Sequence, residues 1–498
     1  MVGMDDLSHL VVGIDELVPT SGGAMVRYVN LDNAATTPPM RGALDAVHAV
    51  LPSYASVHRG SGHKPRVCTA AYERARGCVG ASVGADPDRD TVIFTKNTTE
   101  AINRLARAMT IDDNAIVLTT VIEHHSNDLP WRARARTLHV RARADGTLDL
   151  DHLDHLLAAN AGRVALLAVS GASNVTGIVP PIHDIATRVH AAGGRVLIDA
   201  AQLAAHRRID MRSHDDPGHL DYVALSAHKL YAPFGSGALI GRRDGFAPTP
   251  DHRGGGTVNA VTVDDVAWAD LPDREEAGTP NLLGAVAFAA AARTLGEVGW
   301  SRIMAHETAL LAHAMKALAV LPGIRVHGPT GVDALTSKVA VIPFTVDGFD
   351  HGLVAAILGY EHGIGVRSGC FCAHPYIAHL LGLNAATATA WLAHARRGDK
   401  RGAPGMIRIS LGLYNDRSDI DRLIAALAAI IAGDFSGEYR SDEHGDYHPT
   451  AHWSTTRFDH SAPATAATRW RTSGPSTQPR ALDRLLDDTS VTNIKAPS

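Results

Sequence analysis

Short apolar runs rich in β-branched residues alternate with alanine-rich helical stretches along most of this chain, and no other feature constrains its fold as much. Strands that are apolar at nearly every position are buried on both faces, as in a parallel sheet covered by helices. We therefore predict an α/β fold, with a mostly parallel sheet between layers of helices. The predicted strands are TVIFT (Thr91–Thr95), AIVLTT (Ala115–Thr120), RVALLAVS (Arg163–Ser170), RVLIDA (Arg195–Ala200), YVALSA (Tyr222–Ala227) and GALIG (Gly237–Gly241).

The pattern changes along the chain and divides it into four segments. We predict an N-terminal leader over residues 1–26 and a large domain over 27–295, with its first helical region as a candidate to pack on the next domain. A smaller α+β domain is predicted over 296–433. From 434 to 498 the sequence is rich in Ser, Thr, Pro, His and charge, so we predict a disordered tail there.

Composition excludes several classes of protein. The net charge of −5 gives no general attraction to nucleic acid or to an anionic membrane. No stretch approaches the roughly 18 consecutive apolar residues that a membrane helix needs. Four cysteines in 498 residues cannot form a disulfide scaffold, and the N-terminus is acidic where a secretory signal would be basic. We expect a cytoplasmic enzyme that binds neither nucleic acid nor membrane.

Two of the predicted strands end in residues that are costly to bury. Lys229 follows one strand, and Asp199 ends another. A lysine more often belongs to a solvated face, and a buried charge needs a partner. Pyridoxal phosphate would supply both partners: its aldehyde forms a Schiff base with a lysine amine, and its pyridinium nitrogen needs an anion. We predict that this pair binds that cofactor.

Other strand ends could hold the rest of the cofactor. Thr98 and Thr99 lie where a strand runs into a helix, and a helix N-terminus with hydroxyls binds phosphate, although helix capping alone would explain them. Ser226 and His228 could complete the phosphate site. The imidazole of His124 could stack on the ring and move protons. Asn174 could donate to the ring hydroxyl, so that this set completes the predicted cofactor site: Thr98, Thr99, His124, Asn174, Ser226 and His228.

These motifs resemble the class V aminotransferase family of pyridoxal-phosphate enzymes, nearest to the branch of cysteine desulfurases and selenocysteine lyases. The resemblance covers about 400 residues in the family's order. It implies the pyridoxal-phosphate-dependent transferase fold of type I, with a seven-stranded sheet, and a homodimer. The matching motifs are YVNLDNAAT (28–36), VHRG (57–60), NTTEAIN (97–103), EHHSN (123–127), IDAAQ (198–202), SAHKLY (226–231), GGGT (254–257), EAGTPN (276–281) and RISLGLYN (408–415).

The resemblance implies a role for each matching residue. It makes Lys229 the Schiff-base lysine, Asp199 the partner of the pyridinium nitrogen and His124 the stacking residue, while Gln202 would bind the ring oxygen. Thr98, Ser226 and His228 would hold the phosphate, with Thr279 contributed by the dimer partner. Arg408 would bind the substrate carboxylate, a bidentate task that suits arginine. The remaining substrate-binding residues implied are His58 and Asn33.

The cysteines bear on the reaction. Cys372, in the loop Arg367–His374, aligns with the sulfur-accepting cysteine of the short-loop desulfurases, which typically show Arg-x-Gly-His-His-Cys-Ala. Cys370 stands where those enzymes have a histidine, and the Cys-Phe-Cys arrangement is similar to that of the molybdenum-cofactor sulfurases. An unreactive, apolar Cys372 is the alternative. A disulfide between Cys370 and Cys372 would close a strained ring, and we expect no metal site.

The segment between Cys372 and Arg408 departs from the desulfurase pattern. It holds an additional alanine-rich helix and a basic run at 396–401, which could reshape the substrate entrance or a partner surface, or could be only a solvated charged face. The long tail also lies outside the resemblance.

We therefore predict a pyridoxal-phosphate enzyme that acts on a small amino acid, with conversion of L-cysteine to L-alanine as the leading reaction. Its sulfur would pass to Cys372 and then to an acceptor, which could be a protein. The alternative is an aminotransferase or another carbon–sulfur or carbon–selenium lyase in which Cys372 takes no part. A nucleotide-binding protein is disfavoured because no glycine-rich phosphate loop follows a strand.

Overall fold

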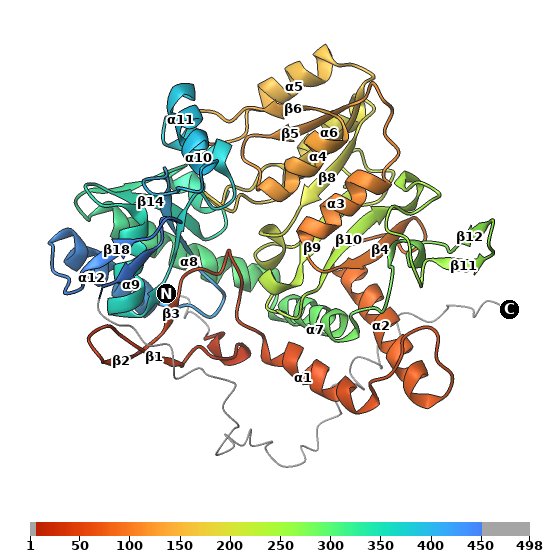
Figure 1. The fold of residues 1–498 in the computed structure, drawn as a ribbon, viewed down its shortest axis with the longest axis horizontal. Coiled ribbons are helices and arrows are strands. Elements are labelled where there is room, and N and C mark those ends of the chain that lie inside the picture. The colour runs from red at the N-terminus through yellow and green to blue at the C-terminus, as the bar shows by residue number, and fades with distance from the viewer. Residues whose placement is uncertain (1–5, 451–498) are drawn as a thin grey trace.

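The computed structural model describes residues 6–450. Its large domain is built on a seven-stranded sheet of order β4-β10-β9-β8-β7-β5-β6, in which β10 is antiparallel to both neighbours and the other pairs are parallel (Figure 1). The strands are β4 (Asp90–Thr95), β5 (Ile116–Thr120), β6 (Arg136–Val140), β7 (Val164–Ser170), β8 (Arg195–Asp199), β9 (Tyr222–Ser226) and β10 (Gly237–Arg242). The predicted α/β architecture is confirmed, as are the six predicted strands.

Strand β6 was not predicted. It lies at the edge of the sheet, and most of its side chains are partly or fully exposed, so it lacks the continuous apolar run of the central strands. An edge strand buried on one side only gives a weaker sequence signal than a strand with neighbours on both sides.

Helices cover both faces of the sheet, and alternate strand residues divide between two cores. One core packs the sheet against α3 (Thr98–Ala108) and α4 (Leu129–Arg134). The larger core packs the opposite face against the remaining helices of the domain: α1 (Arg41–Val50), α2 (His63–Ser82), α5 (Leu150–Ala159), α6 (Ile182–Ala191) and α7 (Leu282–Val298). Side chains at successive strand positions point to opposite faces, so each fully buried strand contributes to both cores.

The smaller domain has an antiparallel sheet of order β13-β14-β17-β16. Its helices and strands are α8 (Trp300–Ala319), α9 (His351–His362), α10 (His374–Leu380), α11 (Ala385–Ala395), α12 (Arg417–Ile431), β13 (Ile324–Val326), β14 (Val341–Val346), β16 (Arg367–Gly369) and β17 (Met406–Ser410). A separate core joins this sheet to α8, α9 and α12. The chain turns by 80° between α7 and α8, close to the boundary predicted at 295.

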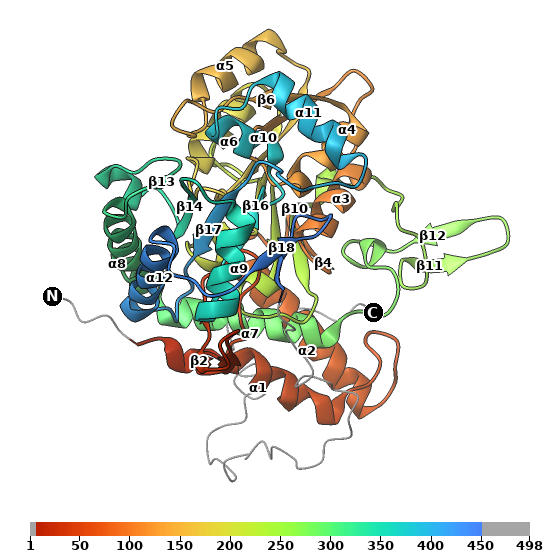
Figure 2. The same cartoon turned by 60° about the vertical axis from the view of Figure 1, so that its left-hand side comes forward.

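The N-terminal region divides between the two domains in an unexpected way. Strand β3 (Val29–Asn30) pairs in parallel with β15 (Ile364–Gly365), and Val29 and Leu31 lie in the smaller domain's core. Helix α1 instead packs on α7 in the larger core (Figure 2). The first helix was a candidate to pack on the smaller domain, and that prediction is wrong.

Three hairpins extend the two domains. The leader forms β1 (Leu17–Pro19) and β2 (Met25–Arg27), while β11 (Val258–Val261) and β12 (Val266–Trp268) project from the large domain (Figure 2). Strands β18 (Tyr439–Ser441) and β19 (Tyr447–Pro449) form the third hairpin, where Tyr439 donates to Glu361 of α9 at 2.8 Å. The prediction of disorder from 434 is therefore wrong as far as 450, and its remainder lies outside the described residues.

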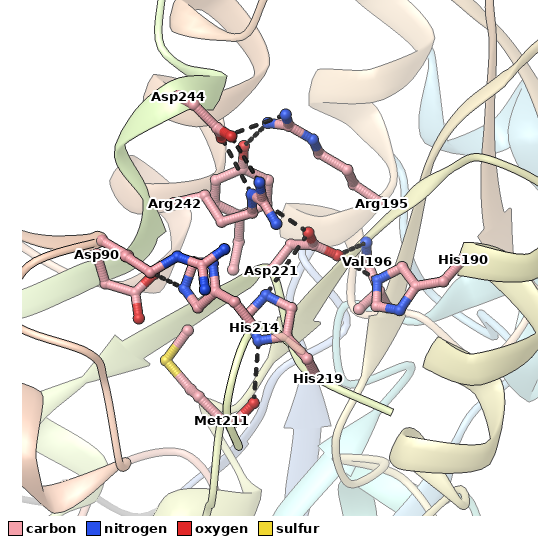
Figure 3. A network of polar contacts seen from close by, with 12 residues as sticks. Asp90, His190, Arg195, Val196, Met211, His214, His219, Asp221, Arg242 and Asp244 are labelled. Atoms are coloured by element: carbon pink, nitrogen blue, oxygen red, sulfur yellow. Dashed lines mark hydrogen bonds and ion pairs between the residues drawn. The ribbon is translucent and has the colours of Figure 1, made fainter. Parts of the chain in front are cut away.

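A polar network ties the strands together at the end of the sheet opposite their carboxyl ends (Figure 3). Asp221, just before β9, accepts from the backbone of Val196 at 2.9 Å and lies 2.7 Å from His190. His214 lies 2.9 Å from Asp90, at the start of β4. These contacts fix the amino ends of the strands. The opposite edge of the sheet, with the carboxyl ends, is the edge at which a site can form.

Within residues 6–450, no single helix is long and apolar enough to cross a membrane. Helices α7 and α8 reach that length and composition only when taken together across their 80° bend.

Candidate active site

A cavity of about 250 Å³ lies at the carboxyl ends of five strands of the large sheet, where the loop carrying Cys372 meets it. The carboxyl ends of parallel strands share one edge, and open α/β sheets bind ligands there. Eleven of the residues predicted for the site line this cavity: Thr98, Thr99, His124, Asn174, Asp199, Gln202, Ser226, His228, Lys229, Cys372 and Arg408.

Lys229 and Asp199 both have pKa values that are shifted by burial. Burial lowers the pKa of the Lys229 amine to about 8, against an opposing effect of Asp199 and with a further lowering by Arg408. Burial raises the pKa of Asp199, whose Oδ1 accepts from the backbone N–H of Ala201 at 3.0 Å. The cavity thus offers a nucleophilic amine and a buried carboxylate.

The start of α3 provides a site for an anion. Asn97 caps the helix by accepting from the backbone of Glu100 at 3.0 Å, so the first turn is fixed. The Ser226 hydroxyl accepts from the Thr98 backbone and donates to the Thr98 hydroxyl, both at 2.8 Å. Backbone N–H groups at a helix N-terminus carry partial positive charge, so this corner of the cavity favours a phosphate.

His228 and Thr99 flank the same corner. His228 Nδ1 lies 3.2 Å from the Thr36 hydroxyl, and burial, with the nearby Lys229, lowers its pKa to about 4. The imidazole is therefore neutral near pH 7. The Thr99 hydroxyl lies 2.8 Å from that of Ser126, which connects the start of α3 to the loop after β5.

His124 has a defined protonation state. Its Nδ1 accepts from the Ser126 backbone at 3.1 Å, and burial lowers its pKa to about 3. A neutral imidazole that accepts at Nδ1 carries its proton on Nε2. His124 is therefore a neutral side chain with one N–H available to the cavity.

The buried carboxyl of Glu123 supports this loop from behind. It accepts from the hydroxyls of Thr120 and Ser170, both at 2.6 Å, and from the Asn127 amide at 2.7 Å. Burial outweighs these hydrogen bonds and raises its pKa to about 7. Because Ser170 ends β7 and Thr120 ends β5, Glu123 links the two strand ends that present His124 and Asn174.

Arg408 is almost fully buried at the side of the cavity. Its guanidinium donates to Asp32 Oδ1 at 2.7 Å and to the Asn174 carbonyl at 3.0 Å, and it lies 5.0 Å from the Phe371 ring centroid. The Nε atom is buried without a hydrogen-bond partner among the described residues. A guanidinium held in this way has donors left for a carboxylate.

The two cysteines of the loop have different environments. Cys372 is exposed and lines the cavity. Cys370 is partly buried, donates to the Pro404 carbonyl at 2.9 Å, and has its pKa raised by burial to about 12. Thiolates rather than thiols are nucleophiles, so Cys372 is the better placed of the two for chemistry.

Two cavity residues have amides already engaged. Gln202 donates to the Ala34 carbonyl at 2.7 Å, and Asn174 donates to the Phe371 carbonyl at 2.7 Å. The second N–H of each amide remains for a ligand.

Three predicted site residues do not line the cavity. Asn33 is buried and hydrogen-bonded to Ser410 and Asn415, which makes it part of the domain junction. His58 lies 2.7 Å from Glu73, and Thr279 is exposed. The structure therefore does not bring His58, Asn33 or Thr279 to the cavity of their own chain.

Some cavity residues were not predicted, namely Ala34, Ala35, Asn97, Ser126, Ser170, Ala172, Ala201, Arg367 and Phe371. Most lie within two or three residues of a predicted one, so the same sequence motifs could have indicated them. Phe371 and Arg367 lie in the smaller-domain loop that was predicted to bring Cys372 to the site, but the sequence did not single them out as lining residues. Within residues 6–450, no group of three or more His, Cys, Asp or Glu side chains could hold a metal ion.

Comparison with known proteins agrees with this geometry. The family model described as Aminotransferase class-V matches residues 29–423. The chain is 33% identical to a cysteine desulfurase of Haloferax volcanii over 80% of its own length and 89% of that protein, and 34% identical to a probable cysteine desulfurase of Streptomyces coelicolor over 80% and 91%. A solved apo structure of a cysteine desulfurase from Thermococcus onnurineus superposes with a TM-score of 0.71 at 29% identity, covering 82% of this chain and 95% of the other.

Proposed function

The chain belongs to the class-V aminotransferase family, and from that premise we propose that it is a pyridoxal-phosphate-dependent cysteine desulfurase. It would convert L-cysteine to L-alanine and take the sulfur on Cys372. The observation that supports this most directly is the exposed Cys372 thiol on the cavity that also contains Lys229, Asp199 and Arg408.

The donor set of the cavity fits pyridoxal phosphate. A lysine amine with a pKa near 8 suits its aldehyde, a buried carboxylate suits its pyridinium nitrogen, and the start of α3 with Thr98 and Ser226 suits its phosphate. When bound, the cofactor supplies an aldehyde for the substrate amine and a ring that accepts electrons from the substrate carbons. Thr99, His124, Asn174, Gln202 and His228 complete the proposed cofactor site.

The side chains around this site have separate tasks. Arg408 would bind the substrate carboxylate with the donors that Asp32 and Asn174 leave free. The Lys229 amine would take and return protons at Cα, because its lowered pKa leaves much of it neutral near pH 8. His124 lines the same cavity, where its neutral imidazole would donate the Nε2 proton.

Cys372 would accept the sulfur as a thiolate. Its Sγ would attack the substrate sulfur, so that an S–S bond forms while the Cβ–S bond breaks. The electron pair of the broken bond stays with the carbon skeleton, which takes up a proton and leaves as alanine. The sulfur is thereby oxidised to the persulfide level, and the carbon is reduced by the same two electrons.

The test uses the purified holoenzyme and L-cysteine. We expect alanine in the product and a mass increase of one sulfur on the peptide that contains Cys372. Cys372→Ser should abolish both transfer to a thiol acceptor and the persulfide. Cys370→Ser is the matched control and should keep both, because Cys370 is tied to Pro404. A protein that releases no alanine from L-cysteine is not a desulfurase.

The same variant separates the second candidate activity. An aminotransferase or a carbon–selenium lyase would keep most of its turnover in Cys372→Ser, because its reaction does not need a sulfur-accepting thiol. A Cys372→Ser protein with full turnover on another amino acid would therefore replace the desulfurase assignment.

We further propose a homodimer in which Thr279 reaches the partner's phosphate site, and an acceptor protein that collects sulfur from Cys372. Thr279 and Cys372 are both exposed, as these roles require. A cytoplasmic location is proposed because Cys372 must remain a free thiol, which reducing compartments maintain.

A further inference from the structure

The backbone around Cys372 is held by His125, the residue after His124. The His125 N–H donates to the Cys372 carbonyl at 2.7 Å. Its Nε2 accepts from the backbone N–H of His374 at 3.2 Å. His125 thus binds the chain on both sides of Ala373, which is itself fully buried.

The loop needs such support. Phe371 and Cys372 both lie in the left-handed region, with φ of 51° and 56°. That conformation is unfavourable for a non-glycine residue, and it persists only where the surroundings hold it. Asn174, which donates to the Phe371 carbonyl, supports the loop from the cavity side, and His125 supports it from the other.

Ring contacts connect His125, His374 and Trp391, none of which lines the cavity. The His125 and His374 rings are nearly parallel, with centroids 4.6 Å apart, and their Nε2 and Nδ1 atoms are 2.9 Å apart. Trp391 of α11 contacts His374 in turn, with ring centroids 4.5 Å apart and ring planes inclined by 37°. The Trp391 Nε1 atom is buried without a hydrogen-bond partner among the described residues, so this ring contributes contact rather than a hydrogen bond.

The position of the proton on the His125 ring follows from its hydrogen bond with the His374 backbone N–H. Because the His374 N–H can only donate, His125 Nε2 must be unprotonated, and neutral His125 carries its proton on Nδ1. Burial lowers the pKa of His125, and burial with His125 and Lys400 lowers that of His374 to about 4. Both rings are therefore neutral near pH 7, and the hydrogen bond is formed.

We propose that His125 is a positioning residue for the Cys372 thiol, and that Trp391 of the additional helix α11 completes its hold through His374. The proposal rests on the desulfurase function above. His125 is not among the residues that line the cavity, so it acts through the loop and not on the reacting atoms. The proposal also assigns a function to the additional segment between Cys372 and Arg408, namely to hold His374 in place through Trp391.

Two variants of His125 test the role of its ring. His125→Ala removes the acceptor for the His374 N–H. His125→Gln keeps an acceptor oxygen at nearly the same reach as Nε2. Amide hydrogen exchange, followed by mass spectrometry on the peptide containing Ala373–Ile377, should be faster in His125→Ala and closer to wild type in His125→Gln, with exchange elsewhere unchanged. Sulfur transfer from L-cysteine to Cys372 should slow about tenfold or more in His125→Ala, because small misplacements of a reacting group are costly.

Binding of L-cysteine separates positioning from a general loss of structure. The change in cofactor absorption on adding L-cysteine reports a step before sulfur transfer, and its midpoint should be the same in wild type and His125→Ala. Trp391→Ala should show the same pattern more weakly, and it keeps the test valid should His125→Ala fail to fold. Leu392→Ala is the matched control, since Leu392 is exposed on the same helix and should change neither measurement.

The outcomes decide the proposal. Exchange at the loop that is unchanged in His125→Ala and in Trp391→Ala would overturn it, as would normal sulfur transfer in both variants. A wild-type enzyme that moves no sulfur would instead refute the desulfurase function, and the exchange measurement would still show whether His125 holds the loop.

Discussion

The lysine at the centre of the cavity is surrounded by groups that oppose one another. Burial and Arg408 lower the pKa of Lys229, while Asp199 raises it, and the net result is a pKa near 8. An ordinary lysine titrates above pH 10. The amine is therefore partly neutral at physiological pH, as a nucleophile must be.

The pH dependence of cofactor uptake tests this balance. Only the neutral amine of Lys229 attacks an aldehyde, so uptake of pyridoxal phosphate by the apo-protein should rise about tenfold per pH unit below 8 and level off above it. In Asp199→Asn the levelling should move to lower pH, since Asp199 raises the pKa of Lys229. Stopped-flow absorbance measures both, with Lys229→Ala as the control that takes up none covalently. A rise that continues beyond pH 10 would contradict the lowered pKa.

The sequence predicted most of the polar residues that line the cavity. Lys229, Asp199 and Thr98 each follow a buried strand, and parallel strands bring their carboxyl ends to one edge. His125 was not found, because its role depends on His374 and Trp391, far away in the chain. The family resemblance already favoured Cys372 over Cys370, and the structure adds the physical difference: Cys372 is exposed, whereas Cys370 is partly buried with a raised pKa.

A buried ion pair joins α2, β4 and the segment leading to α7. Arg76 donates to both carboxylate oxygens of Glu276, at 2.6 and 3.0 Å. Glu276 also accepts from the Phe94 backbone at 2.6 Å and from the Tyr72 hydroxyl at 2.8 Å. The pair is nearly buried and fixes the segment before Thr279 to the large domain, and Arg76 also donates to the partly exposed Glu73 at 3.0 Å.

We expect removal of one member of this pair to lower the free energy of unfolding more than replacement of both. Arg76→Ala leaves the Glu276 carboxylate buried without its cation, so we expect a loss of about 3–5 kcal/mol in the free energy of unfolding. The double variant Arg76→Met with Glu276→Leu should lose less than Arg76→Ala, because no buried charge is then left unpaired; Glu73, which also contacts Arg76, is partly exposed and keeps His58. Urea unfolding at one fixed protein concentration measures the two values. A double variant that is less stable than the single would show that the hydrogen bonds to Phe94 and Tyr72 matter more than the charges.

The elements themselves differ in how clearly the sequence encodes them. The central strands were found, whereas the edge strand β6 was missed because it is partly exposed. Hairpin β18–β19 lies in a region whose average composition indicates disorder, but Phe435 and Tyr439 pack against the smaller domain's core. A few aromatic side chains with partners outweigh the surrounding polar residues, and composition alone does not show those partners.

For the whole molecule, the exposed position of Thr279 makes the quaternary structure testable. Asn281, two residues on, caps α7 and donates to the carbonyls of Phe234 and Gly235, so the segment is held in place while Thr279 faces outward. A hydroxyl fixed at the surface can serve a second subunit, and it does not line the cavity of its own chain.

Subunit complementation tests this arrangement. Lys229→Ala and Thr279→Glu should each be inactive as homodimers, the second because a carboxylate repels the phosphate. Co-expression should restore roughly a quarter of wild-type activity, since half of the dimers are mixed and each mixed dimer has one intact site. Thr279→Ser is the control and should remain active. Co-expressed variants that stay inactive would show that Thr279 does not act across the interface.

The sequence alone determined the sheet, the strand ends that carry Lys229 and Asp199, and the family to which the chain belongs. These features depend on local sequence pattern. A strand that is buried on both faces needs a continuous run of apolar residues, and parallel pairing brings the polar residues at the strand ends to one edge of the sheet. The tertiary structure decided which cysteine is accessible, which residues hold the Cys372 loop and which predicted residues do not line the cavity. Those properties arise from packing between segments hundreds of residues apart, such as His125 with His374 and Asn33 with Ser410, and no local pattern carries them.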